Sequence, residues 1–121
     1  MKGARADVRI RPRIRVLSGD VVVFGPGKAD LLDAIRELGS IRDAAKALGM
    51  SYMRAWTLVR TMNRGFRDPV VTLERGGAAH GGAVLTETGR LVLGLYREME
   101  TASLRAMSPA SRRLGRRLRR L

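Results

Sequence analysis

The sequence has no cysteine and only one histidine, and each of these gaps excludes a class of function. Without cysteine there is no disulfide, no thiolate zinc site and no cysteine nucleophile. A lone histidine, His80, does not make the ligand cluster of a zinc site. No nucleophile is paired with a base in the pattern either, so we expect no enzyme, no metal site and no cofactor.

The sequence also lacks a long apolar run. The one candidate, residues 91–95, is far shorter than a membrane-spanning helix requires. No charged segment followed by an apolar one opens the chain, as it would in a secretion leader. We therefore expect a cytoplasmic protein with no membrane partner, and the length of 121 residues fits one domain with one modest core.

Acidic residues are scarce, and the excess of basic ones lies at the two ends of the chain. There are 24 Lys and Arg against 11 Asp and Glu, a formal net charge of +13. Residues 1–15 hold six basic side chains and one acid, residues 112–121 hold six arginines, and the segment between them is nearly balanced. Such ends commonly bind nucleic acid, although a solubilising or disordered tail explains either end alone almost as well.

Alternating apolar and basic residues predict a strand near the amino terminus. Within residues 8–17 two faces alternate, the pattern of a strand buried on one side. One face consists of Val8, Ile10, Ile14 and Val16, and the other of Arg9, Arg11, Arg13 and Arg15. Pro12 lies on the apolar parity, so this strand should be at an edge or interrupted there. A turn at residues 18–20 and a second strand over Val21–Phe24 complete a predicted hairpin.

Three helical patterns follow. Residues 28–38 carry apolar side chains at helical spacing, and Gly39 stands where a left-handed residue ends a helix. Ser40 is the predicted N-cap of a second helix, which reaches residue 48. Gly49 provides a sharp turn, and Ser51 caps a third helix over about residues 52–62. The predicted inward residues are Leu31, Leu32, Ile35 and Leu38, then Ile41, Ala44, Ala45 and Leu48, then Ala55, Leu58, Val59 and Met62.

The third helix keeps polar side chains on its outer face. Its predicted outward residues are Tyr52, Met53, Arg54, Thr57, Arg60 and Thr61. A helix, a short glycine turn and a capped helix with a polar face are typical of a helix-turn-helix, whose second helix enters a DNA major groove. An ordinary helical hairpin inside a bundle gives the same pattern, so this stretch alone leaves both readings open.

The following segment favours the DNA-binding reading. Residues 70–74 and 83–85 are predicted strands on either side of a glycine-rich loop at 76–82, and a helix-turn-helix followed by such a hairpin is a winged helix. A final helix is predicted over residues 86–106, with Pro109 ending it. Its apolar stripe is close to coiled-coil spacing, which predicts dimerisation, with packing onto its own domain as the alternative. The stripe consists of Leu91, Leu95, Met99, Ala102 and Ala106.

Three motifs carry a resemblance to a known family: GPG at residues 25–27, GSI..AA..LGMSY..AW at 39–56, and GG..GGA.LT..G at 76–89. Over residues 24–100 the chain resembles the N-terminal DNA-binding domain of ModE-type molybdate-responsive regulators. The resemblance implies a dimeric winged helix that binds operator DNA, typically beside molybdate-transport genes. Full-length regulators of this type continue into molybdate-binding barrels. The arginine-rich residues after Pro109 lack such strands, so we expect no molybdate sensor here.

These patterns together predict a mostly α-helical chain with small β-hairpins: a winged helix-turn-helix domain with a C-terminal dimerisation helix over residues 1–109, and an arginine-rich tail over 110–121. We expect a sequence-specific transcription regulator that binds double-stranded DNA as a homodimer, in the cytoplasm and on the nucleoid. The candidate DNA-binding residues are Ser51, Tyr52, Met53, Arg54, Trp56, Thr57, Arg60 and His80.

The candidate residues carry different expectations. Arg54 can address a guanine edge or a phosphate, with a solvated arginine as the alternative. Tyr52 and Thr57 can contact phosphate or base, whereas an indole beside an inward stripe, such as Trp56, is more often core. His80 is either a wing contact or has no role. Two other functions stay open: a basic nucleoid-associated or RNA-binding protein with little sequence specificity, and an accessory protein that dimerises with a sensor-bearing partner.

Overall fold

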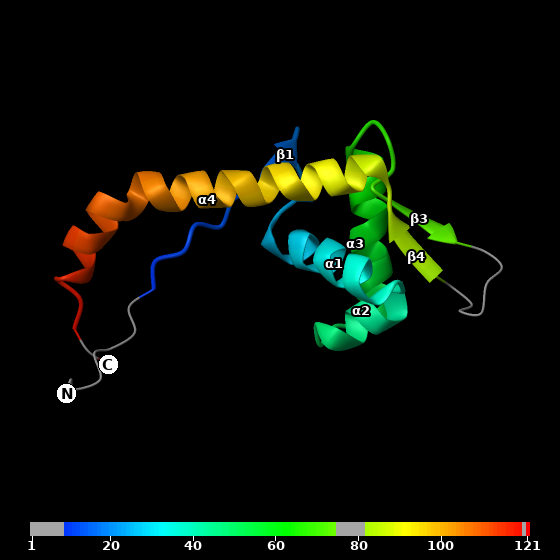
Figure 1. The fold of residues 1–121 in the computed structure, drawn as a ribbon, viewed down its shortest axis with the longest axis horizontal. Helices are drawn as coiled ribbons and strands as arrows, with labels where there is room; N and C mark the ends of the chain where they lie inside the picture. The colour runs from blue at the N-terminus through cyan, green and yellow to red at the C-terminus, as the bar shows by residue number, and fades with distance from the viewer. Residues whose placement is uncertain (1–8, 75–81, 120) are drawn as a thin grey trace.

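The computed structural model describes residues 9–74, 82–119 and 121, and its elements confirm the winged helix-turn-helix fold. Figure 1 shows α1, α2 and α3 gathered with the hairpin β3–β4 at one end of the long helix α4. The elements are β1 (Val16–Ser18), β2 (Val21–Phe24), α1 (Pro26–Leu38), α2 (Ile41–Ala47), α3 (Tyr52–Gly65), β3 (Val71–Glu74), β4 (Gly82–Leu85) and α4 (Glu87–Gly115).

Helix α1 begins two residues before the predicted start at residue 28. Pro26 occupies its first position, where a missing N–H costs nothing and the fixed φ suits a helix. Gly39 ends the helix in the left-handed region, with φ of 72°, as predicted. Leu31, Leu32 and Ile35 are fully buried, but Leu38 is 47% exposed, because it lies in the last turn beyond the packed part of the helix.

The turn between α2 and α3 forms as the sequence predicts. The Ser40 hydroxyl oxygen accepts the Asp43 N–H at 2.9 Å, and the Ser51 hydroxyl oxygen accepts the Arg54 N–H at 3.0 Å, so both helices are capped. Gly49 has a φ of 69°, in the left-handed region, which residues with a side chain adopt unfavourably. The inward predictions hold for Ile41, Ala44, Ala45, Ala55, Val59 and Met62, whereas Leu58 is half-buried and Leu48 is exposed at the end of α2.

The core joins the three-helix unit to α4 through an aromatic contact. Phe24 at the end of β2 meets the buried Tyr96 ring of α4 edge to face, with 5.0 Å between the ring centroids. Phe66, just after α3, meets the same Phe24 ring at 6.1 Å. Edge-to-face pairs of this kind add to the free energy of burial. The few aromatic residues of the chain therefore serve mainly where its elements meet.

The predicted strand over residues 8–17 is wrong for most of its length. Only β1 pairs with β2, and residues 9–15 form no strand, although their half-buried and exposed side chains alternate as expected. This segment runs beside α4 (Figure 1), and the Tyr96 hydroxyl donates to the Ile14 carbonyl oxygen at 2.8 Å. Alternating half-buried and exposed side chains indicate an extended chain with one side packed against the protein. Here that protein surface is a helix, which offers no ladder of backbone hydrogen bonds.

The wing strands pair in register, one residue away from their predicted bounds. Val71 lies opposite Leu85 and Glu74 opposite Gly82, so β4 begins at Gly82 rather than at residue 83 and β3 begins after Val70. The rest of the predicted loop lies outside the described residues. The hairpin is tied to the α1–α2 junction because the Ala83 N–H donates to the Gly39 carbonyl oxygen at 2.9 Å.

Helix α4 does not end at Pro109, which corrects the predicted boundary. The helix continues to Gly115 with Pro109 inside it, and the ribbon bends in its orange-to-red part (Figure 1). A proline removes one helical hydrogen bond and crowds the preceding turn, and such sites often kink a helix without breaking it. Residues 110–115 are thus helical. That the domain ends at residue 109 and residues 110–121 act as a separate tail stays a prediction.

Two glycines of α4 give a matched test of this packing. A Cβ at Gly89 would collide with the Val70 backbone, whereas a Cβ at Gly94 meets nothing within 4 Å. We expect Gly89→Ala to lower the free energy of unfolding by about 2 kcal/mol or more through overpacking. Gly94→Ala should raise it by roughly 0.5–1 kcal/mol through helix propensity. Urea unfolding measures both, and equal effects would contradict the described contact.

Candidate nucleic-acid interface

The outer face of α3 presents most of the residues predicted to bind DNA. Met53 is 70% exposed, and Thr57 and Arg60 continue the same face along the helix. The Thr57 hydroxyl donates to the Met53 carbonyl oxygen at 3.0 Å, so its oxygen remains available as an acceptor. The exposed members of the predicted set are Ser51, Tyr52, Met53, Arg54, Thr57 and Arg60.

The remaining two predicted residues differ from this group. Trp56 is half-buried and packs against the core, in line with the expectation for an indole beside the inward stripe. Its ring meets Tyr52 edge to face at 6.2 Å, and the Arg60 guanidinium lies 6.0 Å from the indole centroid. His80 lies outside the described residues. Trp56 therefore supports the outer face from beneath.

One flank of this face carries an arginine that the sequence analysis missed. Arg42 of α2 lies over the Tyr52 ring, with its guanidinium carbon 4.5 Å from the ring centroid. A cation above an aromatic face is attracted electrostatically by the ring and keeps its positive charge. No local pattern in the sequence indicates this pair, because the two residues are ten apart and meet only through the angle between α2 and α3.

The opposite flank is a notch lined by four cations, and we name it the cation notch. It lies beside the start of α1 and is lined by Arg13, Arg15, Lys28 and Arg54. Burial, together with the nearby charges of Arg54 and Arg15, lowers the pKa of Lys28 from its ordinary value. The Lys28 ammonium donates to the Val22 carbonyl oxygen at 3.3 Å. Only Arg54 of the four was a predicted site residue.

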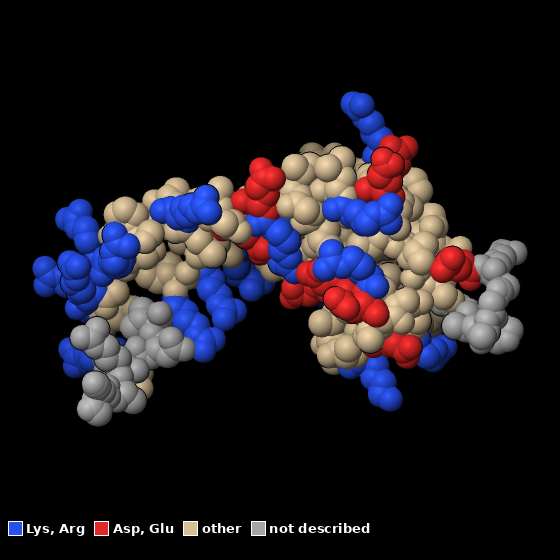
Figure 2. Space-filling model, viewed as in Figure 1, with Lys and Arg blue, Asp and Glu red and all other residues tan. Residues whose placement is uncertain are grey.

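Three acidic side chains meet one arginine at the seam between α1 and α4. Arg97 bonds Asp33, and it also bonds Asp30 at 3.1 Å and Glu100 at 2.9 Å. The hydrogen bond to Asp33 is the largest of the interactions that raise the pKa of Arg97. Figure 2 shows a group of acidic residues over the middle of the molecule, other acidic and basic residues spread over the rest of the visible face, and a group of basic residues at the far end of α4. Among the described residues no ion pair reaches Arg42, Arg54 or Arg60.

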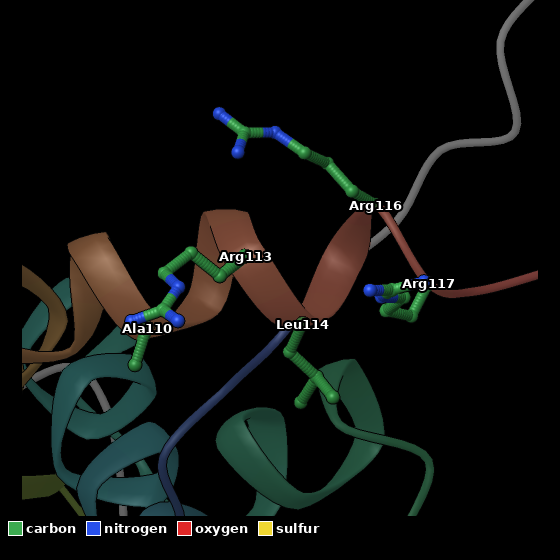
Figure 3. Close-up of a pocket in the computed structure, with 5 residues that line it drawn as sticks. All are labelled: Ala110, Arg113, Leu114, Arg116 and Arg117. Atoms are coloured by element: carbon green, nitrogen blue, oxygen red, sulfur yellow. The ribbon is translucent and has the colours of Figure 1, made fainter.

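The far end of α4 carries a second group of cations. Figure 3 shows Arg113, Arg116 and Arg117 around Ala110 and Leu114, with Arg116 directed away from the other two. In the ranges that the structure describes, these three arginines have no acidic partner. The predicted basic end is thus presented on the last helical turns of α4 and just beyond them.

Asn63 fixes the wing strands relative to α3. Its side-chain oxygen accepts the Val70 N–H at 2.8 Å and the Val71 N–H at 3.3 Å, while its amide donates to the Val71 carbonyl oxygen at 3.1 Å. One side chain therefore satisfies three backbone groups where β3 begins. Asn63 was not among the predicted site residues, because an asparagine near the end of a helix is common and indicates no particular partner.

The arrangement defines a class of protein, the winged helix-turn-helix, and solved structures agree. The full-length LTTR protein LysG from Corynebacterium glutamicum matches 74% of this chain and 29% of its own, with a TM-score of 0.54 and 24% sequence identity. A likeness at this identity concerns the fold alone. Among the described residues, no helix is long and apolar enough to cross a membrane and no group of acidic or histidine side chains could hold a metal.

The sequence itself is similar to ModE-type proteins, which confirms the predicted resemblance. The molybdenum-pterin-binding protein MopB of Rhodobacter capsulatus is 40% identical over 92 residues, 76% of this chain and 34% of that protein. The molybdenum transport protein ModE of Azotobacter vinelandii is 40% identical over 85 residues, 70% of this chain and 32% of that protein. The DNA-binding transcriptional dual regulator ModE of Escherichia coli is 39% identical over 71 residues, 59% and 27% of the two chains. No family model matches, and the chain spans about a third of the length of these relatives.

The role of Asn63 can be tested by removing its side chain. Asn63→Ala leaves two half-buried N–H groups and one carbonyl without their partner, so we expect the free energy of unfolding to fall by about 1–3 kcal/mol. Thr61→Ala is the control, because the Thr61 hydroxyl bonds only within α3, to the Thr57 carbonyl oxygen. Denaturant unfolding of both variants measures the difference. An Asn63→Ala protein as stable as Thr61→Ala would contradict the assignment.

Proposed function

We propose that this chain is a sequence-specific DNA-binding transcription regulator whose helix α3 enters the major groove of double-stranded DNA. The observation that carries the proposal is the exposed face of α3, bordered on both flanks by cations that have no acidic partner in the described structure. A duplex presents base edges to such a helix and phosphates to the groups beside it. The relatives named as regulators support the same assignment.

Within this proposal the predicted residues take different roles. Met53, Thr57 and Arg60 form the outermost stripe and read base edges, Met53 through apolar contact and the other two through hydrogen bonds. Ser51 and Tyr52 lie at the start of the helix, where Tyr52 and the adjacent Arg42 contact the backbone. Trp56 acts through Arg60 and Tyr52 rather than by touching DNA, and a wing contact by His80 belongs to the same proposal.

The names of the relatives suggest the regulated process. Proteins similar to this chain are named for molybdenum transport and molybdenum-pterin binding, so we propose that its target genes concern molybdenum. The described residues from 87 onward form only α4 and the turn after it, with no strands. We therefore propose that these 121 residues contribute DNA binding and form no molybdate site of their own.

A homodimer through α4 is part of the proposal. Leu91, Leu95 and Met99 are 59%, 49% and 43% exposed, while Leu93 and Tyr96 on the opposite side of the helix pack into the domain. Ala102 and Ala106 continue the exposed side and would allow a second helix to approach closely. Pairing α4 with its copy would cover this stripe and place two α3 helices on one duplex.

A second candidate function rests on the cations at the end of α4. The unpaired Arg113, Arg116 and Arg117 favour a basic nucleoid-associated or RNA-binding protein with little sequence choice. Such a protein would bind all duplexes about equally and lose affinity steeply with salt. The exposed, capped α3 with its wing is an argument against this function, because neither feature is needed for nonspecific charge binding.

Site selection with the full chain tests the two functions. We expect a selected duplex to bind at least about 1,000-fold more tightly than a scrambled one at the same salt concentration. Arg60→Ala should cost about 1–3 kcal/mol on the selected duplex and less on the scrambled one, because it removes a base contact. Fluorescence anisotropy measures both affinities. Arg67→Ala, which removes an exposed arginine after α3, is the control. Equal affinity for both duplexes would favour the nonspecific function.

The α4 dimer has its own test. Leu95→Glu places a charge in the centre of the exposed stripe, so we expect a dimeric wild type and a monomeric variant, with paired half-sites bound at least about tenfold more weakly. Leu17→Glu in β1 is the control, because Leu17 is similarly exposed, at 54%, but lies off α4. Sedimentation at micromolar concentration distinguishes the states. A monomeric wild type would contradict the proposed dimer.

A further inference from the structure

The cation notch gathers charge from three separate parts of the chain. Arg13 and Arg15 come from the segment beside α4, Lys28 from the first turn of α1, and Arg54 from the first turn of α3. Residues far apart in the sequence are thus brought to one concave surface. In the part of the chain that the structure describes, none of the four forms an ion pair.

The surrounding fold does not relieve the repulsion between these charges. No acidic side chain lines the notch, and Asp30 and Asp33, which follow Lys28 on α1, both bond Arg97 of α4. Asp33 also bonds Arg36 at 2.6 Å. Lys28 is partly removed from water, and both that burial and its cationic neighbours lower its pKa. A surface with this arrangement is unfavourable when empty and becomes favourable when an anion enters.

We propose that the cation notch binds one backbone phosphate of the DNA duplex that holds α3, and that Arg54 contacts this phosphate rather than a base. The inference rests on the proposed function. Arg54 lines the notch together with Leu58, also from α3, so the notch is continuous with the recognition helix. An anion seated there is therefore beside the groove that α3 occupies.

The donors suit a phosphate ester of a duplex. Arginine presents several N–H donors in a plane, and a lysine ammonium presents three, one of which is already used by the Val22 carbonyl oxygen. A phosphate has enough oxygens to accept from more than one of these side chains at once. Backbone contacts of this kind fix the position of a recognition helix without reading sequence. The segment containing Arg13 and Arg15 thus extends the interface beyond the helix-turn-helix and its wing.

The test compares Arg15→Gln, Lys28→Gln and their double variant with Arg67→Gln, which removes one charge away from the notch. Each protein is titrated with the selected and the scrambled duplex over a range of salt concentrations. We expect each notch variant to lose about 5–30-fold in affinity on both duplexes alike, and the double variant to lower the slope of log K against log salt by about one. Because both side chains hold the same phosphate, the double variant should lose less than the product of the single losses.

Two conservative variants separate the charge from the packing. Arg15→Lys and Lys28→Arg keep the positive charge, so they should retain most of the affinity that the glutamine variants lose, and thermal unfolding checks that every variant is folded. A parallel titration uses inorganic phosphate alone at constant ionic strength. We expect it to bind more weakly than about 1 mM, because a free anion lacks the other duplex contacts.

The outcomes distinguish the notch from the proposed function. If wild type prefers the selected duplex and the notch variants bind like Arg67→Gln, the notch proposal is wrong and the function stands. A loss confined to the selected duplex would also overturn it, since that would mean base reading. Tight binding of inorganic phosphate that Lys28→Gln abolishes without changing DNA affinity would make the notch a small-anion site. A wild type with no affinity for either duplex would instead refute the proposed function.

Discussion

The contact between Tyr96 and Phe24 is the interaction on which the arrangement of the molecule depends. Tyr96 is buried, its ring meets Phe24 at 5.0 Å, and its hydroxyl donates to the Ile14 carbonyl oxygen. Burial, and next the carboxylate of Glu100, raise the pKa of Tyr96, so this donor stays protonated at neutral pH. The contact joins α4 to the three-helix unit, and the bond to Ile14 holds the segment 9–15 beside α4. The exposed stripe of α4 and the cation notch both follow from it.

The surface has one region where positive charges are paired with carboxylates and another where they are not. At the seam of α1 and α4 every described carboxylate that faces Arg97 is used, and the result is a closed network that stabilises packing. On the flanks of α3, Arg42 lies over an aromatic ring and Lys28 donates to a carbonyl oxygen. Neither partner neutralises a positive charge. The fold therefore leaves these positive charges uncompensated on the side where α3 is exposed.

The sequence predicts local structure well where one short segment contains the whole signal. The caps at Ser40 and Ser51, the turns at Gly39 and Gly49, and the wing hairpin all depend on neighbours within a few residues. The errors arise where the partner is remote. Alternation in residues 9–15 reports burial on one side but not which element covers it, and the effect of Pro109 depends on the helical turns that continue around it.

In the candidate site, too, the sequence predicts what depends on neighbouring residues and misses what depends on remote ones. The outer face of α3 is readable from helical spacing, because Met53, Thr57 and Arg60 are neighbours on one helix. Its flanks are not, since Arg42 meets Tyr52 through an angle between helices and Lys28 meets Arg54 through the packing of α1 on α3. In the sequence Arg13 and Arg15 are two of the six basic residues near the amino terminus, and nothing distinguishes them from the other four. The bond from Tyr96 to Ile14 and the packing of Ile14 and Val16 against the core hold these two arginines beside Lys28 and Arg54, and our phosphate proposal depends on that position.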